Sequence, residues 1–454
     1  MKDLKIGLVL GNEISMPDAF EGLLRKLDLK IKYGGETFTF HTERVTIEPF
    51  NIRQKPRYNI VIERVSHWHI NPREWLKKVI IDGVYVVNNP FNFQAMEKHT
   101  GFTLLAKLGV LIPETWLLPQ KDQSDLLQEA LELYSKFFDL DEVANKIGYP
   151  LYMKPYDGGG WVGVTKINNS EELHRVYDES GKRMMHLQKS IEFDKFCRAL
   201  NIGPQILPMH YDPTQPLHKR YVIDFDYLTP LEGEEMTKLT KLVGSLFGWE
   251  YNSCEVTILN GVLHPIDFSN PVPDSSLMSL HFYFPWVIKS LIRWVTFCGA
   301  TERKFRFDLH WQKYLDIANE DIDFMDKLNK YMVLADEYFE TEKFEEFCRK
   351  NLSFLDEAAF EYFTSKEFDD IIIKKVTKRF PAHEHDEFIQ HYRGLFQFWA
   401  KCETDRLAGL KQEEKKSESE KEAAEVSVKK AVKRAPAKKT AVKKVTSKKV
   451  AAKK

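Results

Sequence analysis

The sequence predicts an α/β protein in which an N-terminal doubly wound parallel-sheet domain precedes an α+β domain, a C-terminal helical extension and a disordered basic tail. Three observations indicate this order. Short apolar runs alternate with segments of helical periodicity over residues 1–90, a pattern typical of a parallel sheet. Residues 301–408 have helical periodicity and few glycines. Residues 409–454 are a low-complexity, lysine-rich segment that cannot bury a core and is expected to be disordered.

The first 90 residues contain three apolar runs that we expect to be strands and two segments that we expect to be helices. The strands are residues 5–11, 58–65 and 83–90, and the helices are residues 17–29 and 73–80. Pro17 suits the start of its helix, where a missing N–H costs nothing. The glycine that ends the first run is not followed by GK[ST], so this turn is not a Walker phosphate loop.

The middle of the chain mixes helices and strands. The expected helices cover residues 93–109 and 124–148 and a segment that begins at Ser170. The expected strands cover residues 111–118, 149–154, 186–193, 220–228, 253–261 and 262–270. Asn260 and Gly261, between the last two strands, predict a tight hairpin because both residues tolerate a positive φ.

The helical extension shows no obvious chemistry of its own. It contains His383, His385 and His391, but no carboxylate or cysteine stands at a convincing metal-ligand spacing from them. The sequence therefore favours a solvated helix start over a metal site.

The composition is that of an ordinary globular protein and argues against several classes. The 454 residues are 43% hydrophobic and 29% charged, which is enough for sizeable cores in two to four domains. Five widely spaced cysteines without a CxxC pair argue against a disulfide framework and a zinc site. The N-terminal sequence lacks the apolar segment of a signal peptide, and residues 281–299 read as a buried or amphipathic helix because a proline and two basic residues interrupt them. We expect a cytoplasmic protein without a membrane span.

The net charge of −1 conceals two opposed regions. The tail from Val428 to Lys454 holds twelve of the 66 Lys and Arg residues and no acid. The rest of the chain therefore has 54 basic against 67 acidic residues, a net charge of about −13. The tail contacts nucleic acid or another polyanion in one interpretation and only solubilises the chain in the other. The acidic body would oppose binding to nucleic acid.

The most informative motif is the segment YPLYMKPYDGGGWVGV, residues 149–164. It predicts a strand that ends near Lys154 and a turn with three glycines, Gly158, Gly159 and Gly160. A lysine neutralises phosphate charge, and glycines let backbone N–H groups approach phosphate oxygens closely, so the arrangement suits a triphosphate. An ordinary surface turn is the alternative interpretation of this segment alone.

The order of motifs around this segment resembles the ATP-grasp superfamily of carboxylate-amine ligases, which includes D-alanine–D-alanine ligase, glutathione synthetase and the glutamate-adding ligases. Lys98 lies on the preceding helix, and the segment MHLQKSIEF and the acidic hairpin CEVTILNGVLHPIDFSNPVPD follow. The resemblance covers roughly residues 1–300. It implies an N-terminal pre-ATP-grasp domain (residues 1–95) and an ATP-grasp domain (residues 96–300), before the helical extension (residues 301–408) and the tail (residues 409–454).

The resemblance also implies an ATP site. Lys98, Lys154 and the three glycines correspond to the groups that contact the phosphates. The adenine hinge corresponds to Gln188, Lys189, Ser190 and Ile191. The superfamily usually has an acid near the position of Lys189, so recognition of the ribose is assigned to Glu192 or Asp194. Arg198 and Arg220 are the candidate catalytic arginines, placed against the phosphates or the acyl group.

Magnesium is expected on the acidic hairpin, because Mg²⁺ takes oxygen ligands and shares its shell with substrate phosphates. The candidate ligands are Glu255, Asp267 and Asn270. The superfamily pattern is an acid followed by E-x-N, whereas this chain has Asp267-Phe-Ser-Asn270, so Ser269 is an alternative to Asn270 and Asp274 is a reserve candidate.

These motifs predict an ATP- and Mg-dependent ligase that activates a carboxylate as an acylphosphate and joins it to an amine, with small molecules or peptides as substrates. The alternative is a catalytically inactive ATP-grasp module that binds nucleotide as a scaffold or regulator. The altered metal hairpin favours the alternative, and the lysines and glycine loop fit both. The sequence indicates neither the substrates nor the oligomeric state.

Overall fold

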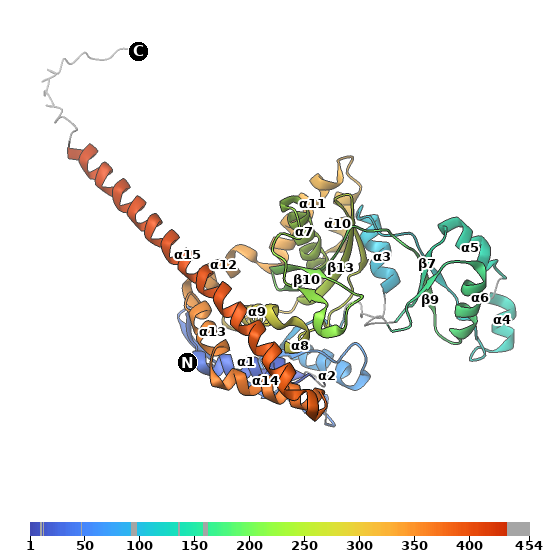
Figure 1. The fold of residues 1–454 in the computed structure, drawn as a ribbon, viewed down its shortest axis with the longest axis horizontal. Coiled ribbons are helices and arrows are strands. Elements are labelled where there is room, and N and C mark those ends of the chain that lie inside the picture. Colours follow the sequence, from blue (N-terminus) through green and yellow to red (C-terminus); the bar gives the residue numbers. More distant parts are fainter. Residues whose placement is uncertain are drawn as a thin grey trace, which may run out of the picture. The chain divides into compact units, whose positions relative to one another are not determined.

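A computed structural model gives the fold of the chain and describes residues 1–9, 11, 13–46, 48–91, 98–134, 137–157 and 162–433 (Figure 1). Residues 1–399 form one compact unit, and residues 400–454 form a second. The first unit has a mixed α/β fold, as expected, with three sheets among its described residues. The four-part division of the chain remains a prediction.

The N-terminal sheet has five strands. They are β1 (Lys2–Val9), β2 (Lys30–Tyr33), β3 (Glu36–Arg44), β4 (Ile60–Glu63) and β5 (Tyr85–Val87). Their order in the sheet is β2-β3-β1-β4-β5, and all neighbours are parallel except the antiparallel pair β2 and β3. The prediction of a parallel sheet is thus right for the three expected strands, which are β1, β4 and β5. The β2–β3 hairpin was missed, although Gly34 and Gly35 between its strands both have a positive φ, which is typical of a two-residue hairpin turn.

Helices cover both faces of this sheet, because successive strand residues point to opposite sides. Helix α2 (Ile70–Ile81) packs on the face that includes Val61. Helix α9 (Phe284–Ala300) packs on the opposite face, where a Cβ added to Gly299 would meet the side chain of Ile60 at 2.8 Å. Helix α1 (Ser15–Leu27) contacts both β3 and α9.

A smaller sheet follows in the order β6-β9-β7-β8, with all neighbours antiparallel. Its strands are β6 (Thr115–Leu118), β7 (Leu151–Pro155), β8 (Thr165–Ile167) and β9 (Met185–Lys189). The helices of this region are α3 (Lys98–Lys107), α4 (Gln128–Tyr134), α5 (Leu140–Ile147) and α6 (Ser170–Glu179). Helix α6 starts at Ser170, as the sequence predicted. Its N-cap is Asn169, whose side chain accepts a hydrogen bond from the backbone N–H of Glu172.

The third sheet has the order β12-β11-β10-β13-β14 and is antiparallel throughout. Its strands are β10 (Lys195–Ile202), β11 (Gln205–Tyr211), β12 (Tyr221–Val222), β13 (Tyr251–Leu259) and β14 (Val262–Asp267). The hairpin at Asn260 and Gly261 is confirmed, with φ values of 51° and 80°. The strand expected at residues 220–228 shortens to two residues. The hairpin of β10 and β11 and the helix α7 (Pro230–Phe247), which packs on this sheet, were missed.

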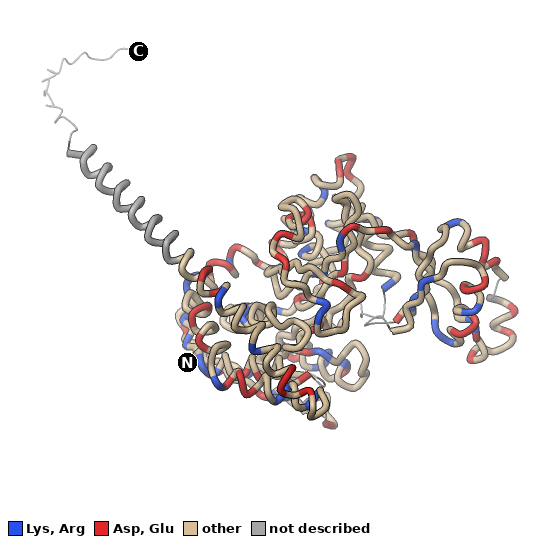
Figure 2. Tube along the Cα trace, in the orientation of Figure 1, with Lys and Arg blue, Asp and Glu red and all other residues tan. Residues whose placement is uncertain are grey.

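Residues 284–300 form the buried helix that their composition predicted, and no helix of the described residues is long and apolar enough to cross a membrane. The other helices of this part of the chain are α8 (Leu277–Leu280), α10 (Trp311–Ala318), α11 (Phe324–Phe339), α12 (Thr341–Asn351), α13 (Leu355–Phe363) and α14 (Lys366–Arg379). Helices α13 and α14 contact α1, and α12 and α13 contact α9 (Figure 1). The extension therefore packs on the N-terminal region. Figure 2 shows basic and acidic residues interspersed along these helices.

Helix α15 (His385–Lys433) begins at the segment with the three histidines, so the predicted helix start is confirmed. The helix continues through residues 409–433, and the disorder expected for the tail stays a prediction. Their many Ala, Glu and Lys residues are strong helix formers, and this local preference needs no packed core. Residues 434–454 of the tail lie outside the described residues.

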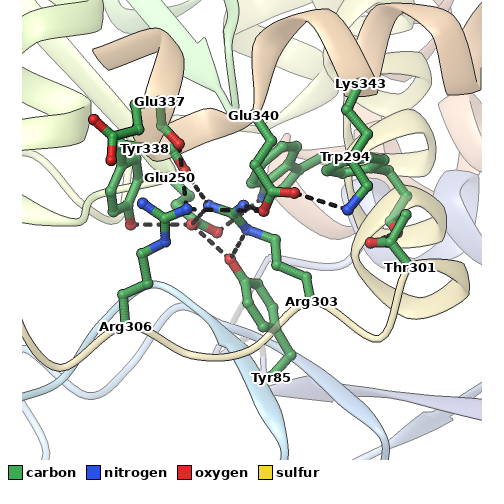
Figure 3. Close-up of polar contacts among 11 residues, drawn as sticks. Tyr85, Glu250, Trp294, Thr301, Arg303, Arg306, Glu337, Tyr338, Glu340 and Lys343 are labelled. Carbon is green, nitrogen blue, oxygen red and sulfur yellow. Dashed lines mark hydrogen bonds and ion pairs between the residues drawn. The ribbon is translucent and has the colours of Figure 1, made fainter. Parts of the chain in front are cut away.

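A buried polar network joins the N-terminal sheet to the third sheet and the extension (Figure 3). Arg303 donates from Nε to the Tyr85 hydroxyl at 2.8 Å, and from Nη2 to the backbone carbonyl of Tyr338 at 2.5 Å. Glu250 accepts hydrogen bonds from the Tyr85 hydroxyl at 2.6 Å and from Trp294 Nε1 at 2.9 Å. Glu250 and Arg303 are 3% and 7% exposed. Both charges have therefore lost their contact with water, and the hydrogen bonds to these partners compensate for that loss.

We expect Glu250→Ala to lower the free energy of unfolding by about 3–5 kcal/mol, because it leaves the buried Arg303 guanidinium undercompensated. Urea unfolding followed by circular dichroism measures the change. The control is Glu36→Ala, which removes an exposed ion pair with Lys2 and should have a much smaller effect. An equal effect of both substitutions would contradict the role of the network.

Candidate nucleotide site

A cavity of about 250 Å³ lies between the smaller sheet and the third sheet. Strands β7 and β9 supply one wall, and β13 and β14 supply the other. The charged and polar lining consists of Lys98, Lys154, Gln188, Lys189, Thr214, Glu255, Thr257 and Asp267. The apolar lining includes Tyr152, Val164, Ile191, Phe193, Phe196 and Ile266. We call this apolar part of the lining the apolar slot, and Lys98, Lys154, Glu255 and Asp267 of the charged part lie close to one another.

Lys154 lies near the end of β7, and its side chain is 9% exposed. Its ammonium donates to Gln188 Oε1 at 2.8 Å and to the backbone carbonyl of Ile266 at 3.0 Å, and it lies 4.9 Å from the centre of the Phe102 ring. Burial lowers the pKa of Lys154 to about 8, an effect that the Asp267 carboxylate opposes and the Lys98 ammonium increases. Neither hydrogen-bond partner of the Lys154 ammonium is a carboxylate, so its positive charge is available to interact with a bound anion.

Lys98 is the first residue of α3 and is 4% exposed. Its ammonium contacts Asp267 Oδ2 at 2.5 Å. The other carboxylate oxygen of Asp267, Oδ1, is buried and has no hydrogen-bond partner. The helix and the strand β14 therefore bring together two residues that are 169 positions apart in the chain.

Glu255 faces Asp267 across the β13–β14 pair and is 4% exposed. Burial raises the pKa of Glu255, the nearby Arg198 guanidinium opposes this shift, and the like charge of Asp267 adds to it. Arg198 Nη2 lies 3.4 Å from Glu255 Oε1, and Arg198 also contacts Ser253 Oγ at 3.3 Å and the Tyr211 hydroxyl at 3.4 Å. All three contacts are long for a buried guanidinium.

The predicted adenine hinge lies along β9 and the residues after it. Gln188 donates from Nε2 to Thr115 Oγ1 at 2.7 Å, while its carbonyl oxygen accepts from Lys154. Lys189 and Ile191 line the cavity. The backbone N–H groups of Lys189 and Ser190 already donate to carbonyl oxygens of Glu114 and Pro150.

Several predicted site residues lie apart from this cavity. The Asp194 carboxylate accepts from the backbone N–H of Asn260 at 2.8 Å and so stabilises the hairpin turn. Glu192 is exposed and is not part of the lining. Arg220 donates from Nε to the Gln215 carbonyl at 2.8 Å and lies near the Tyr211 hydroxyl. Gly158, Gly159 and Gly160 lie outside the described residues.

The remaining candidates for magnesium follow β14. Asn270 donates from its backbone N–H to Asn252 Oδ1 at 2.8 Å, which holds the loop against β13. Ser269 is buried. Asp274 accepts the backbone N–H of Ser276 at 3.0 Å through Oδ1, and its Oδ2 is buried without a partner.

Sequence reasoning missed the apolar slot. Tyr152, Phe193 and Phe196 line the cavity but carry no motif, and they read as ordinary strand or loop residues. One signal was available for Tyr152: it lies two residues before Lys154 on the same strand, so both side chains point to the same face.

No family model matches the chain. The chain is 34% identical to D-alanine–D-alanine ligase of Neisseria meningitidis serogroup B over 82 residues, 16% of this chain and 25% of that protein. It is 27% identical to the same ligase of Heliobacterium modesticaldum over 90 residues, which are 19% of this chain and 25% of that protein. It is 32% identical to biotin carboxylase 2 of Bacillus subtilis over 85 residues, which are 17% of this chain and 18% of that protein. The chain spans a quarter or less of the length of these relatives.

Solved structures also match. D-alanine–D-alanine ligase of Bacillus anthracis complexed with ATP has a TM-score of 0.40 and 14% identity, over 75% of this chain and 99% of that chain. VanG D-Ala:D-Ser ligase of Enterococcus faecalis has a TM-score of 0.42 and 11% identity, over 74% of this chain and 100% of that chain. The sequence matches support the ATP-grasp superfamily, and the chain is similar to its ligases, as the order of motifs predicted.

Proposed function

We propose that the cavity binds ATP and that the protein is an ATP- and Mg²⁺-dependent ligase that joins a carboxylate to an amine. The observation that carries this proposal is the convergence of two buried lysines, Lys98 and Lys154, and two acids, Glu255 and Asp267, at one end of a cavity with an apolar slot. Two of the sequence relatives are named as D-alanine–D-alanine ligases, which agrees with it.

The lining suits ATP in two parts. A nucleobase would fit between apolar side chains such as Tyr152, Ile191 and Phe193, where its ring excludes water. The phosphates would lie near Lys98 and Lys154, whose buried ammonium groups act more strongly there than in bulk water.

The acids suit Mg²⁺. Asp267 offers a buried carboxylate oxygen without a partner, and Glu255 faces it on the neighbouring strand. The described residues contain no group of three or more His, Cys, Asp or Glu that could hold a metal ion by themselves. This agrees with Mg²⁺, which takes one or two carboxylates and completes its shell with phosphate oxygens and water. Bound there, Mg²⁺ would neutralise charge on the phosphates.

The chemistry follows from the weak electrophilicity of a carboxylate. Transfer of the γ-phosphoryl group from ATP to the carboxylate oxygen gives an acylphosphate and ADP. An amine then attacks the acyl carbon and loses a proton to water, the C–O bond to phosphate breaks, and inorganic phosphate leaves with the electron pair of that bond. This reaction needs positioned positive charge rather than a protein nucleophile, and Arg198 is a further fixed cation beside Glu255.

Lys154→Ala should weaken ATP binding at least tenfold in titration calorimetry, because a charge-assisted contact of roughly 1.5–3 kcal/mol is lost. Lys166→Ala is the matched control, since Lys166 is exposed on the neighbouring strand β8. Equal affinities for the two variants would refute the assignment of Lys154.

Asp267→Asn should abolish Mg-dependent ADP formation, because it removes a charge from the proposed metal site at nearly constant volume. With the correct acid, hydroxylamine should trap the acylphosphate of the unaltered protein as a hydroxamate. Asp226→Asn, an exposed change after β12, serves as the control. Normal turnover of Asp267→Asn would show that the metal is held elsewhere.

An inactive nucleotide-binding scaffold is the second candidate, and one observation favours it. Both proposed metal ligands already have cationic neighbours, Lys98 at Asp267 and Arg198 at Glu255. If these pairs persist with nucleotide bound, Mg²⁺ cannot reach the acids. Electron paramagnetic resonance with Mn²⁺ and ATP separates the two proposals, since a scaffold of this kind binds ATP without ordering the metal.

We also propose that the basic tail contacts a polyanion such as nucleic acid. Residues 428–454 hold twelve Lys and Arg residues and no acid, which supports the proposal. Affinity for a DNA oligonucleotide should fall steeply with salt, because each neutralised phosphate releases counterions. A chain that ends at Leu410 should lose the binding. Binding that is independent of salt, or that the shortened chain keeps, would rule out this role.

A further inference from the structure

The loop between β11 and β12, residues 212–220, lies between the nucleotide cavity and the helical extension, and we call it the cavity loop. Pro213 and Thr214, near its start, line the cavity. Its second half contains the short turn Leu217–Lys219, which packs on helix α8. The loop therefore connects the proposed nucleotide site to a part of the fold outside it.

Hydrogen bonds within the cavity loop make it one compact unit. The Asp212 carboxylate accepts from the backbone N–H and the hydroxyl of Thr214 at 2.9 and 2.6 Å, and from Gln215 Nε2 at 3.2 Å. The Arg220 guanidinium donates to the Gln215 carbonyl at 2.8 Å, and the Asp212 backbone N–H donates to the Arg220 carbonyl at 2.8 Å. Because these bonds join both ends of the loop, a displacement of the turn Leu217–Lys219 also moves Thr214.

Helix α15 of the extension reaches this loop through an aromatic contact. The Phe388 ring stacks on the Phe380 ring, with 3.6 Å between the ring centres, and meets the His218 ring edge-on at 5.6 Å. One turn further along α15, the Tyr392 hydroxyl donates to the Met278 carbonyl of α8 at 3.3 Å. The first turns of α15 are thus packed against both the cavity loop and the helix beside it.

Three imidazoles lie near this contact. His218 belongs to the cavity loop, His391 to α15 and His281 to the turn after α8. His391 interacts electrostatically with both His218 and His281. The charged side chains that act on these imidazoles are Lys219, next to His218, and Glu387, one turn before His391.

Protonation of these imidazoles is unfavourable while α15 contacts the loop. Burial lowers the pKa of His218, and the positive charges of Lys219 and of protonated His391 lower it further. Burial and Lys219 also lower the pKa of His391, an effect that Glu387 opposes. When the contact opens, each pKa rises toward its ordinary value of about 6.5, so the contact loses stability as the pH falls through about 6.5. Burial lowers the pKa of His281 to about 4, so His281 stays neutral in this range.

We infer that α15 positions the cavity loop for nucleotide binding, and that protonation of His218 and His391 releases the loop. The inference rests on the proposed function, because the cavity is the proposed ATP site. Phe388 and His218 are positioning residues, since neither is part of the cavity lining and both act on it through Thr214. The extension would thus set the affinity for ATP and make it depend on pH.

The first test compares ATP affinities at about pH 7.5 and about pH 5.5, measured by titration calorimetry on the full-length protein with Mg²⁺. His218→Phe keeps an aromatic ring beside Phe388 but cannot take up a proton. Between the two pH values, the unaltered protein should lose about fivefold more affinity than His218→Phe, a coupling of ordinary size. Titration of ATP and of Lys154 is common to both proteins and cancels in this comparison.

His174→Phe is the matched control, because His174 is exposed on α6 and pairs with Asp141. Its ATP affinity should depend on pH as that of the unaltered protein does. If His218→Phe shows this same pH dependence, protonation of His218 does not release the loop and the inference is overturned.

Phe388→Ala removes the contact itself and should weaken ATP binding about fivefold at the higher pH as well. Phe354→Ala is its control, because Phe354 is 44% exposed in the same extension. The melting temperature of each variant shows whether it is folded. If Phe388→Ala does not fold, Tyr392→Phe tests the packing of α15 through the loss of the hydrogen bond to Met278. An affinity equal to that of Phe354→Ala overturns the inference.

Hydrogen exchange without nucleotide separates this inference from the proposed function. After correction for the intrinsic effect of pH on exchange, peptides that cover residues 212–220 and 385–392 should lose protection together in acid. Joint loss of protection without any ATP binding supports the contact and its release, and overturns the nucleotide site. ATP binding that depends on Lys154 but not on His218 or Phe388 overturns the inference and leaves the nucleotide site in place.

Discussion

The buried contact between Glu250 and Arg303 is the constraint on which the arrangement of the first unit depends (Figure 3). Glu250 immediately precedes β13, the strand that carries Glu255. Its carboxylate accepts from Tyr85 on β5 and from Tyr338 on α11, so one side chain holds the third sheet to the N-terminal sheet and to the extension. Two buried charges are poor sources of stability, but they specify one arrangement because any other leaves a charge uncompensated.

The same reasoning explains why the helical extension is part of this unit rather than an appendage. Arg303 comes from the segment after α9, and its partners Tyr338 and Glu340 come from the end of α11 and the residue after it. The backbone of β13 is held a second time, because Asn88 exchanges two hydrogen bonds with Tyr251, at 2.7 and 2.8 Å. The positions of the acids at the nucleotide cavity thus depend on contacts far from it.

The sequence allowed many of the local elements and the charged residues of the cavity to be predicted, because each has a local cause. Apolar runs identified most strands, and a glycine and an asparagine identified the hairpin at Asn260. The shortness of β12 and the apolar slot could not be predicted, since both depend on which distant segments meet. Asp194 illustrates this limit. Its position near the hinge suggested that its carboxylate binds ribose, whereas in the structure the carboxylate accepts a hydrogen bond from the backbone N–H of Asn260.

The pairing of Glu255 with Asp267 could not be predicted either, because it depends on the register of the β13–β14 hairpin. Val256 pairs with Pro265, so regular antiparallel pairing would place Ile266 opposite Glu255 and turn Asp267 toward the face of Cys254, which belongs to the apolar core. The register shifts by one residue between Glu255 and Val256, and this bulge brings Asp267 opposite Glu255.

The bulge also accounts for the partner of Lys154. Ile266 is the extra residue of the bulge, and its carbonyl accepts a hydrogen bond from the Lys154 ammonium. Pro265, which has no N–H to donate, suits an edge strand at such a point. One inserted residue therefore sets both the acid pair and the lysine contact, and it explains how the hairpin can depart from the E-x-N spacing and still direct two carboxylates into one cavity.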